Sequence, residues 1–72
     1  MIKYDYSKLR GKIREARMSQ GELAKRVGID PATLSKSLNN KRDFARTEMF
    51  IIHEVLCLPN YEDYFFVVKP AK

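Results

Sequence analysis

The stretch from residue 19 to residue 38, SQGELAKRVGIDPATLSKSL, constrains the fold more than any other part of the chain. Ser19 and Glu22 have the spacing of a capping box, in which each side chain accepts a hydrogen bond from the other residue's amide. Gly28 stands where a left-handed residue ends a helix at little cost. The pattern therefore predicts a helix over about residues 20–27.

A second helix is expected directly after this one. Asp30 can cap it, and Pro31 suits its first position, where no amide donor is needed. Leu34 and Leu38 form its apolar stripe, so the helix should span about residues 31–38. Two short helices joined by a tight turn make a helix-turn-helix, which presents its second helix outward.

Helical patterns also lie on both sides of this motif. One predicted helix covers about residues 7–17, where Leu9 and Ile13 follow the 3.6-residue period of a core-facing stripe. Another has Thr47 as its cap and ends at Leu58, because the following proline disfavours helix in the residue before it. These assignments predict an all-α, compact domain of four to five helices.

The C-terminal segment, residues 59–72, is predicted to be a short extended tail. Its apolar part YFFVV, residues 64–68, alternates weakly, which favours a short strand or an added turn. The helix before it has more apolar residues than one inward stripe needs, namely Phe50, Ile51 and Val55. Either the tail or a second protein chain should cover them.

Length and composition limit what the chain can be. Its 72 residues make one small domain, residues 1–72, with a limited core. One cysteine excludes an internal disulfide, and no apolar run approaches the ~20 residues of a membrane span. No secretory signal is present. We therefore expect a cytoplasmic protein, in a bacterial host cell, without membrane association.

The net charge of +5 is concentrated in one part of the sequence. Residues 1–46 hold 12 basic and 5 acidic side chains, a balance of +7, whereas residues 47–72 hold 2 and 4, a balance of −2. The excess of basic side chains thus lies in the part of the sequence that contains the helix-turn-helix. This distribution is typical of a protein that binds a polyanion, although a solubilising surface is the alternative interpretation.

The motif resembles the helix-turn-helix of the lambda repressor/Cro class, whose pattern is close to S-Q-x-E-L-A-x-x-x-G-(I/V)-x-x-x-T-(I/L)-S. The matching residues are Ser19, Gln20, Glu22, Leu23, Ala24, Gly28, Ile29, Thr33, Leu34 and Ser35. Asn39, Lys41 and Arg42 continue the match into the family's N-G-K-R segment, with Asn40 in place of the glycine. The resemblance covers roughly residues 7–58. The opening YDYSKLRGKI and the late YFF further resemble small temperate-phage regulators of the Cro-like or modulator-of-repression type.

The resemblance implies a binding surface on the second helix of the motif. In that family, side chains at the start of this helix and a turn and a half later reach base edges in the major groove. Carried over position by position, these residues are Asp30, Pro31, Ala32, Thr33, Ser35 and Lys36. Gln20 matches a glutamine that holds a phosphate. The residues expected to contact phosphates beyond the second helix are Asn39, Lys41 and Arg42.

The start of this second helix departs from a typical DNA reader. Pro31 and Ala32 offer no hydrogen bond, and Asp30 brings a negative charge toward phosphates, so capping is the simpler role for Asp30 and Pro31. Each good bidentate contact is worth ~1–3 kcal/mol of discrimination between bases, and few are available here. The residues that can read bases well are Thr33, Ser35 and Lys36.

Two functions fit these residues, and both control transcription in a phage lysogeny/lysis switch. One is a Cro-like regulator that binds operator DNA as a homodimer, joined through the helix near residues 47–58 or through the tail. The other is an antirepressor that binds the cognate phage repressor protein through basic side chains, namely Lys36, Lys41, Arg42 and Arg46. A third interpretation is an antitoxin-like protein that binds a toxin and its own promoter, with residues 59–72 as the toxin-binding segment.

An enzymatic function finds little support among the residues of the chain. His53 and Cys57 lie four apart on one helix face, but zinc needs three or four ligands and the sequence has no other histidine or cysteine. A nucleophile paired with a base would also need an orienting group. We expect both residues to be packing residues in a protein that is not an enzyme, with no metal, cofactor or small-molecule substrate.

Overall fold

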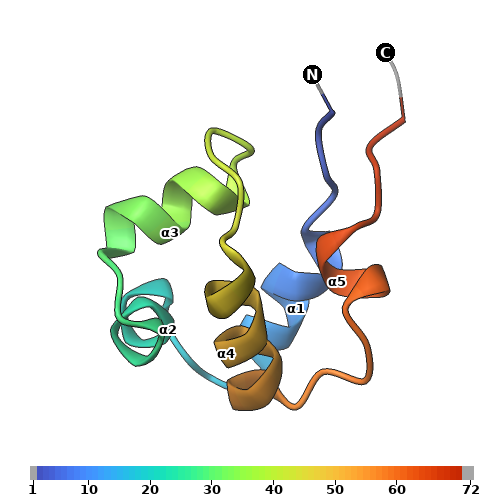
Figure 1. Cartoon of the computed structure of the whole chain (residues 1–72). Helices are drawn as coiled ribbons and strands as arrows, with labels where there is room; N and C mark the ends of the chain where they lie inside the picture. The colour runs from blue at the N-terminus through green and yellow to red at the C-terminus, as the bar shows by residue number, and fades with distance from the viewer. Residues whose placement is uncertain (1, 71–72) are drawn as a thin grey trace.

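A computed structural model describes residues 2–70 of the chain. It is an all-α domain (Figure 1), as the sequence predicted, and its five helices are α1 (Ser7–Glu15), α2 (Gln20–Val27), α3 (Pro31–Leu38), α4 (Arg46–Leu56) and α5 (Glu62–Phe65). Helix α2 packs against both α3 and α4, and α1 packs against α5. None of the helices in the described range combines the length and the apolar character that crossing a membrane requires.

Helix α2 begins and ends at the residues that the sequence predicted. The Ser19 hydroxyl accepts a hydrogen bond from the Glu22 amide at 3.0 Å, and the Glu22 carboxylate accepts one from the Ser19 amide at 3.0 Å. At the other end, Gly28 takes a left-handed conformation with a φ of 90°. The capping box and the glycine therefore fix both ends of this helix through interactions a few residues apart.

Helix α3 follows after a turn of three residues, 28–30. Pro31 occupies its first position, and Leu34 and Leu38 are buried, as expected. The predicted capping role of Asp30 is wrong in one respect. Asp30 stands at the N-cap position with extended backbone, but its side chain makes no hydrogen bond to the helix.

Helices α1 and α4 end earlier than the sequence predicted. Helix α1 stops at Glu15 and not near residue 17, because the chain turns there and Arg17 has a φ of 56°. Helix α4 stops at Leu56 and not at Leu58, because Cys57 already has a left-handed φ of 52°. In both cases a left-handed residue breaks the helical hydrogen bonds before the sequence pattern indicates an end.

The predicted cap of α4 is also wrong. The helix begins at Arg46, one residue before Thr47, and Ala45 holds the N-cap position. The Glu48 carboxylate accepts a hydrogen bond from the Ala45 amide at 2.9 Å. A glutamate inside the first turn thus satisfies the amide of the residue that precedes the helix.

The C-terminal tail is only partly extended. It contains the single turn α5, whose Phe65 is 1% exposed, so this part takes the added turn that the sequence left open and is not extended. After α5 the chain runs antiparallel to the N-terminal arm (Figure 1), with one bridge between Tyr4 and Val68. The Lys69 amide donates to the Lys3 carbonyl at 2.8 Å. The added turn and the short β pairing are both present.

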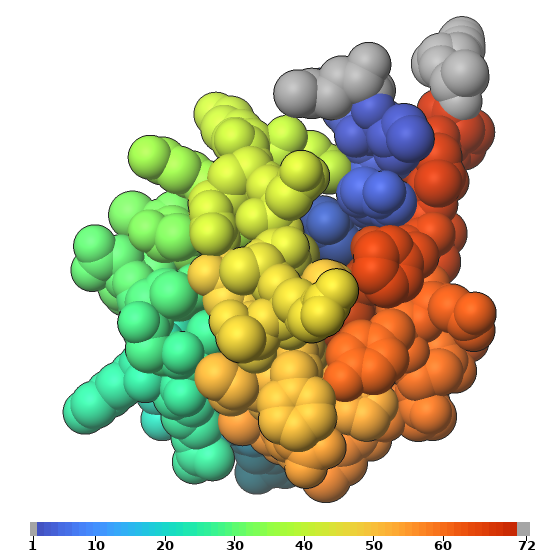
Figure 2. Space-filling view, in the orientation of Figure 1, coloured from blue at the N-terminus to red at the C-terminus, as the bar shows by residue number. Residues whose placement is uncertain are grey.

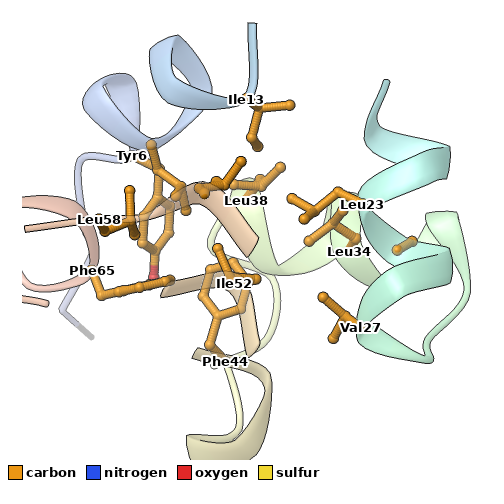
Figure 3. Close-up of a cluster of buried hydrophobic side chains, with 13 residues drawn as sticks. Tyr6, Ile13, Leu23, Val27, Leu34, Leu38, Phe44, Ile52, Leu58 and Phe65 are labelled. Atoms are coloured by element: carbon orange, nitrogen blue, oxygen red, sulfur yellow. The ribbon is translucent and has the colours of Figure 1, made fainter. Parts of the chain in front are cut away.

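Aromatic rings join these distant segments inside the core (Figure 3). Phe44 lies edge-to-face against Tyr6 and against Phe65, with ring centroids 5.4 Å apart in each pair. Ile52 of α4 is fully buried beside them. The N-terminal arm, the loop before α4 and α5 therefore share one core, to which α3 also contributes Leu34 and Leu38.

Candidate functional site

Helix α3 has one buried face and one open face. Leu34, Ser37 and Leu38 are buried against the domain, whereas Pro31, Ala32 and Lys36 are exposed, and the predicted site residues Thr33 and Ser35 are partly exposed. The green segment of α3 forms an outer edge of the molecule in Figure 2. The structure thus brings the predicted residues of this helix to a surface that another molecule can reach.

The two ends of this surface have different chemistry. At the amino end, exposed Pro31 and Ala32 provide only apolar contacts, and the Asp30 carboxylate is exposed beside them. At the carboxyl end, Lys36 and Lys41 are exposed and form no ion pair with other described residues. Their ammonium groups are therefore available to the acidic groups of a partner.

Arg42, a predicted phosphate contact, is engaged inside the protein. Its guanidinium donates to both Glu48 carboxylate oxygens, at 3.0 and 3.2 Å, and to the Ser37 hydroxyl at 2.7 Å. Side-chain exposure is 33% for Arg42 and 11% for Glu48. Such a bidentate pair is among the stronger charge-assisted hydrogen bonds in proteins, so Arg42 joins the end of α3 to α4.

The surroundings of Glu48 keep its carboxyl ionised. Burial raises its pKa, but the hydrogen bonds from Arg42 and from the Ala45 amide, together with the Arg42 charge, outweigh burial and hold the pKa below its usual value. The Arg42–Glu48 pair therefore persists near neutral pH. A phosphate or a carboxylate of a partner would have to compete with Glu48 for Arg42.

Asn39 is also held by neighbouring side chains. Its carbonyl oxygen accepts from the Arg10 guanidinium at 3.0 Å, and its amide nitrogen donates to the Ser35 hydroxyl at 3.3 Å. Arg10 donates in addition to the Leu38 carbonyl at 3.2 Å. Asn39 and Ser35 thus help to fix the carboxyl end of α3 in this structure.

Gln20 lies at the first position of α2 and lines a hollow of about 210 Å³, together with Arg10, Ile13, Arg14 and Met18. Arg14 is exposed and can make this helix amino end attractive to an anion, whereas the Arg10 guanidinium already donates to Leu38 and Asn39. Arg10 and Arg14 were not among the site residues predicted from the sequence. Their spacing of four, which places them on one face of α1, is the signal that could have found them.

His53 and Cys57 do not form a catalytic pair. The His53 ring stacks on Tyr61, with centroids 4.4 Å apart, and its Nδ1 is buried without a hydrogen-bond partner within residues 2–70. The Cys57 thiol instead faces the Glu54 carbonyl at 3.8 Å. Cys57 is exposed, so its predicted packing role is wrong, because the left-handed turn after α4 carries it out of the helix face.

The chain matches a known protein family over most of its length. The model described as "Protein of unknown function (DUF739)" matches residues 2–67, a stretch that includes all five helices. No curated protein matches the chain.

Proposed function

This chain belongs to the DUF739 family, and we propose that it is a helix-turn-helix regulator of transcription in a phage-type lysogeny/lysis switch. The observation that carries the proposal is the outward position of α3, whose exposed Lys36 lies in the cationic part of the chain. A helix in that position can dock against a second macromolecule.

The engaged side chains favour a protein as the partner. A protein that binds a DNA backbone can make roughly six to ten phosphate contacts, each through a basic or amide group. Here Arg42 and Asn39 are held by other residues, and among the contacts predicted on α3 and in the loop after it, Lys36 and Lys41 are the exposed cations. Two lysines at the carboxyl end of α3 and an apolar amino end suit an acidic protein surface, so the function proposed first is antirepression, by binding the cognate repressor.

A separate observation supports operator DNA as the second candidate. The hollow beside Gln20 places the exposed Arg14 next to the amino end of α2, where a backbone phosphate would be favourable. In this form of the proposal the protein acts as a homodimer joined through α4 or the C-terminal tail. Its two α3 helices would then reach half-sites about 34 Å apart.

A gel-shift experiment on switch-region DNA distinguishes the two candidates. The protein is tested alone and together with the repressor encoded beside it. We expect no shift by the protein alone and loss of the repressor's shift when the protein is added. A specific, salt-sensitive shift by the protein alone would support the DNA candidate instead.

The Lys36→Ala variant tests the role of α3 in either candidate. Removing one exposed cation from the contact should weaken inhibition of the repressor, or DNA binding, by about three- to tenfold. Lys8→Ala removes the same charge from an exposed position of α1 and should change neither activity. Unchanged repressor inhibition together with unchanged DNA affinity in Lys36→Ala would remove α3 from the mechanism.

A further inference from the structure

An apolar groove of about 500 Å³ lies between the start of α4 and the C-terminal segment. The residues that line it are Arg46, Thr47, Met49, Phe50, Tyr61 and Phe66. Phe50 is 55% exposed and Phe66 is 47% exposed, which is unusual for phenylalanines in a small domain. Figure 2 shows this face, where the yellow and orange residues of α4 meet the red C-terminal segment.

The walls of the groove are held in place by contacts outside it. The Tyr61 ring stacks on His53 of α4, and the Phe66 ring lies edge-on to Tyr4 at 6.1 Å. Tyr4 is in turn fixed by Asn40, which exchanges two hydrogen bonds with its backbone, at 2.8 and 2.9 Å. The apolar side chains are thus presented on preformed walls, as in a binding groove that changes little on docking.

The charge at the rim selects the kind of occupant. Among the described residues, Arg46 is the only charged residue that lines the groove, and it is exposed without an ion pair. A cation beside an apolar surface attracts a carboxylate more strongly than it would in open water. The chain's net charge of +5 adds a longer-range attraction to acidic partners.

A second copy of the chain suits the groove less well. A two-fold contact centred on the groove would bring the two Arg46 guanidinium groups together, between two chains that each carry a charge of +5. An amphipathic helix from another protein avoids this repulsion, because it can place apolar side chains in the groove and a carboxylate at its rim.

We propose that the groove binds an acidic amphipathic segment of another protein, with two apolar side chains between Phe50 and Phe66 and a carboxylate paired with Arg46. This inference deepens the proposed function and rests on its protein-binding form. The partner then contacts two surfaces of different chemistry, the cationic side of α3 and the apolar groove.

Two synthetic helical peptides of equal length test the inference. Both carry Phe and Leu four residues apart, and one is flanked by glutamates and the other by lysines. Fluorescence anisotropy should show at least tenfold tighter binding of the acidic peptide, and amide chemical shifts should change at the groove residues. Phe50→Ala should weaken this binding about tenfold, and it leaves the core intact because Phe50 is exposed.

A charge reversal makes the test specific to Arg46. Arg46→Glu should reverse the preference, so that the basic peptide binds more tightly, whereas the matched variant Lys8→Glu should keep the original order. Equal binding of both peptides, no binding of the acidic peptide, or shifts confined to α3 would overturn the groove assignment. So would a dimer, seen by sedimentation, that Phe50→Ala dissociates.

The two proposals can fail separately. If Lys36→Ala impairs repressor inhibition but the acidic peptide does not bind the groove, the groove assignment is wrong and the proposed function stands. If the peptide binds as expected but the protein has no effect on the repressor or on DNA, the proposed function is overturned.

Discussion

Residues 1–46 and residues 47–72 differ in charge and in the surface that they present. The first part carries a balance of +7 and exposes lysines on and after α3, whereas the second carries −2 and exposes Phe50 and Phe66. Charges act at long range and speed encounter, while buried aromatic anchors act only on contact. One small domain can therefore present, on different elements, a charged surface that attracts a partner and an apolar surface that holds it on contact.

The two parts also differ in how their helices are stabilised. Helices α2 and α3 are set by local features, such as the Ser19–Glu22 capping box and Gly28. Helix α5 has only four residues, far fewer than the ~12–15 at which even a good isolated helix becomes marginal in water. It exists because Phe65 packs against Phe44 in the shared core.

Phe65→Ala should have the largest effect, because it tests whether the second part depends on this packing. Replacing a fully buried phenylalanine should lower the free energy of unfolding by about 3–5 kcal/mol, measured by urea denaturation. The neighbouring variant Phe66→Ala, at a half-exposed position, should cost less than about 1 kcal/mol. Similar small losses in both variants would show that α5 lies outside the cooperative core.

Glu48→Gln should have an intermediate effect, because it breaks the pair that joins the two parts. At pH 7 we expect a loss of about 1–2 kcal/mol in the free energy of unfolding, since Arg42 keeps a neutral acceptor but loses the charge.

This loss should depend on pH in a defined direction. The folded-state pKa of Glu48 is lowered, so its contribution to stability is present above the unfolded pKa of about 4.3 and is lost as pH falls through the folded pKa. The difference between wild type and Glu48→Gln should therefore shrink below about pH 4. Glu62→Gln, at an exposed carboxylate, should change stability by less than about 0.5 kcal/mol. A difference that grows on acidification would contradict the assignment.

Gly11→Ala should have the smallest effect, and it should stabilise the cationic part. Gly11 lies inside α1, and an added Cβ would meet no atom within 4 Å. Alanine should therefore raise the free energy of unfolding by about 0.5–1 kcal/mol, seen as a higher melting temperature. Gly28→Ala is the control and should lower stability, because Gly28 has a φ of 90°. A destabilised Gly11→Ala would indicate packing of α1 closer than the structure shows.

The functional surface could be predicted from the sequence in part. The position of α3 and the exposure of Lys36 follow from the apolar spacing of Leu34 and Leu38 on the opposite face. The hydrogen bonds between Arg42 and Glu48 could not be predicted in the same way. Glu48 accepts from the Arg42 guanidinium and from the Ala45 amide at once. An arginine in a basic loop gives no sign of whether a carboxylate already holds it.

The two helices of the motif follow from local sequence, since a capping box and a helix-ending glycine act through atoms only a few residues apart. Long-range packing sets where α1 and α4 stop, how the tail turns into α5, and which polar residues remain exposed. Asn40 illustrates the reason, because it hydrogen-bonds Tyr4 across 36 residues of chain. The groove between α4 and the tail has the same origin, since it exists only where segments distant in sequence pack together.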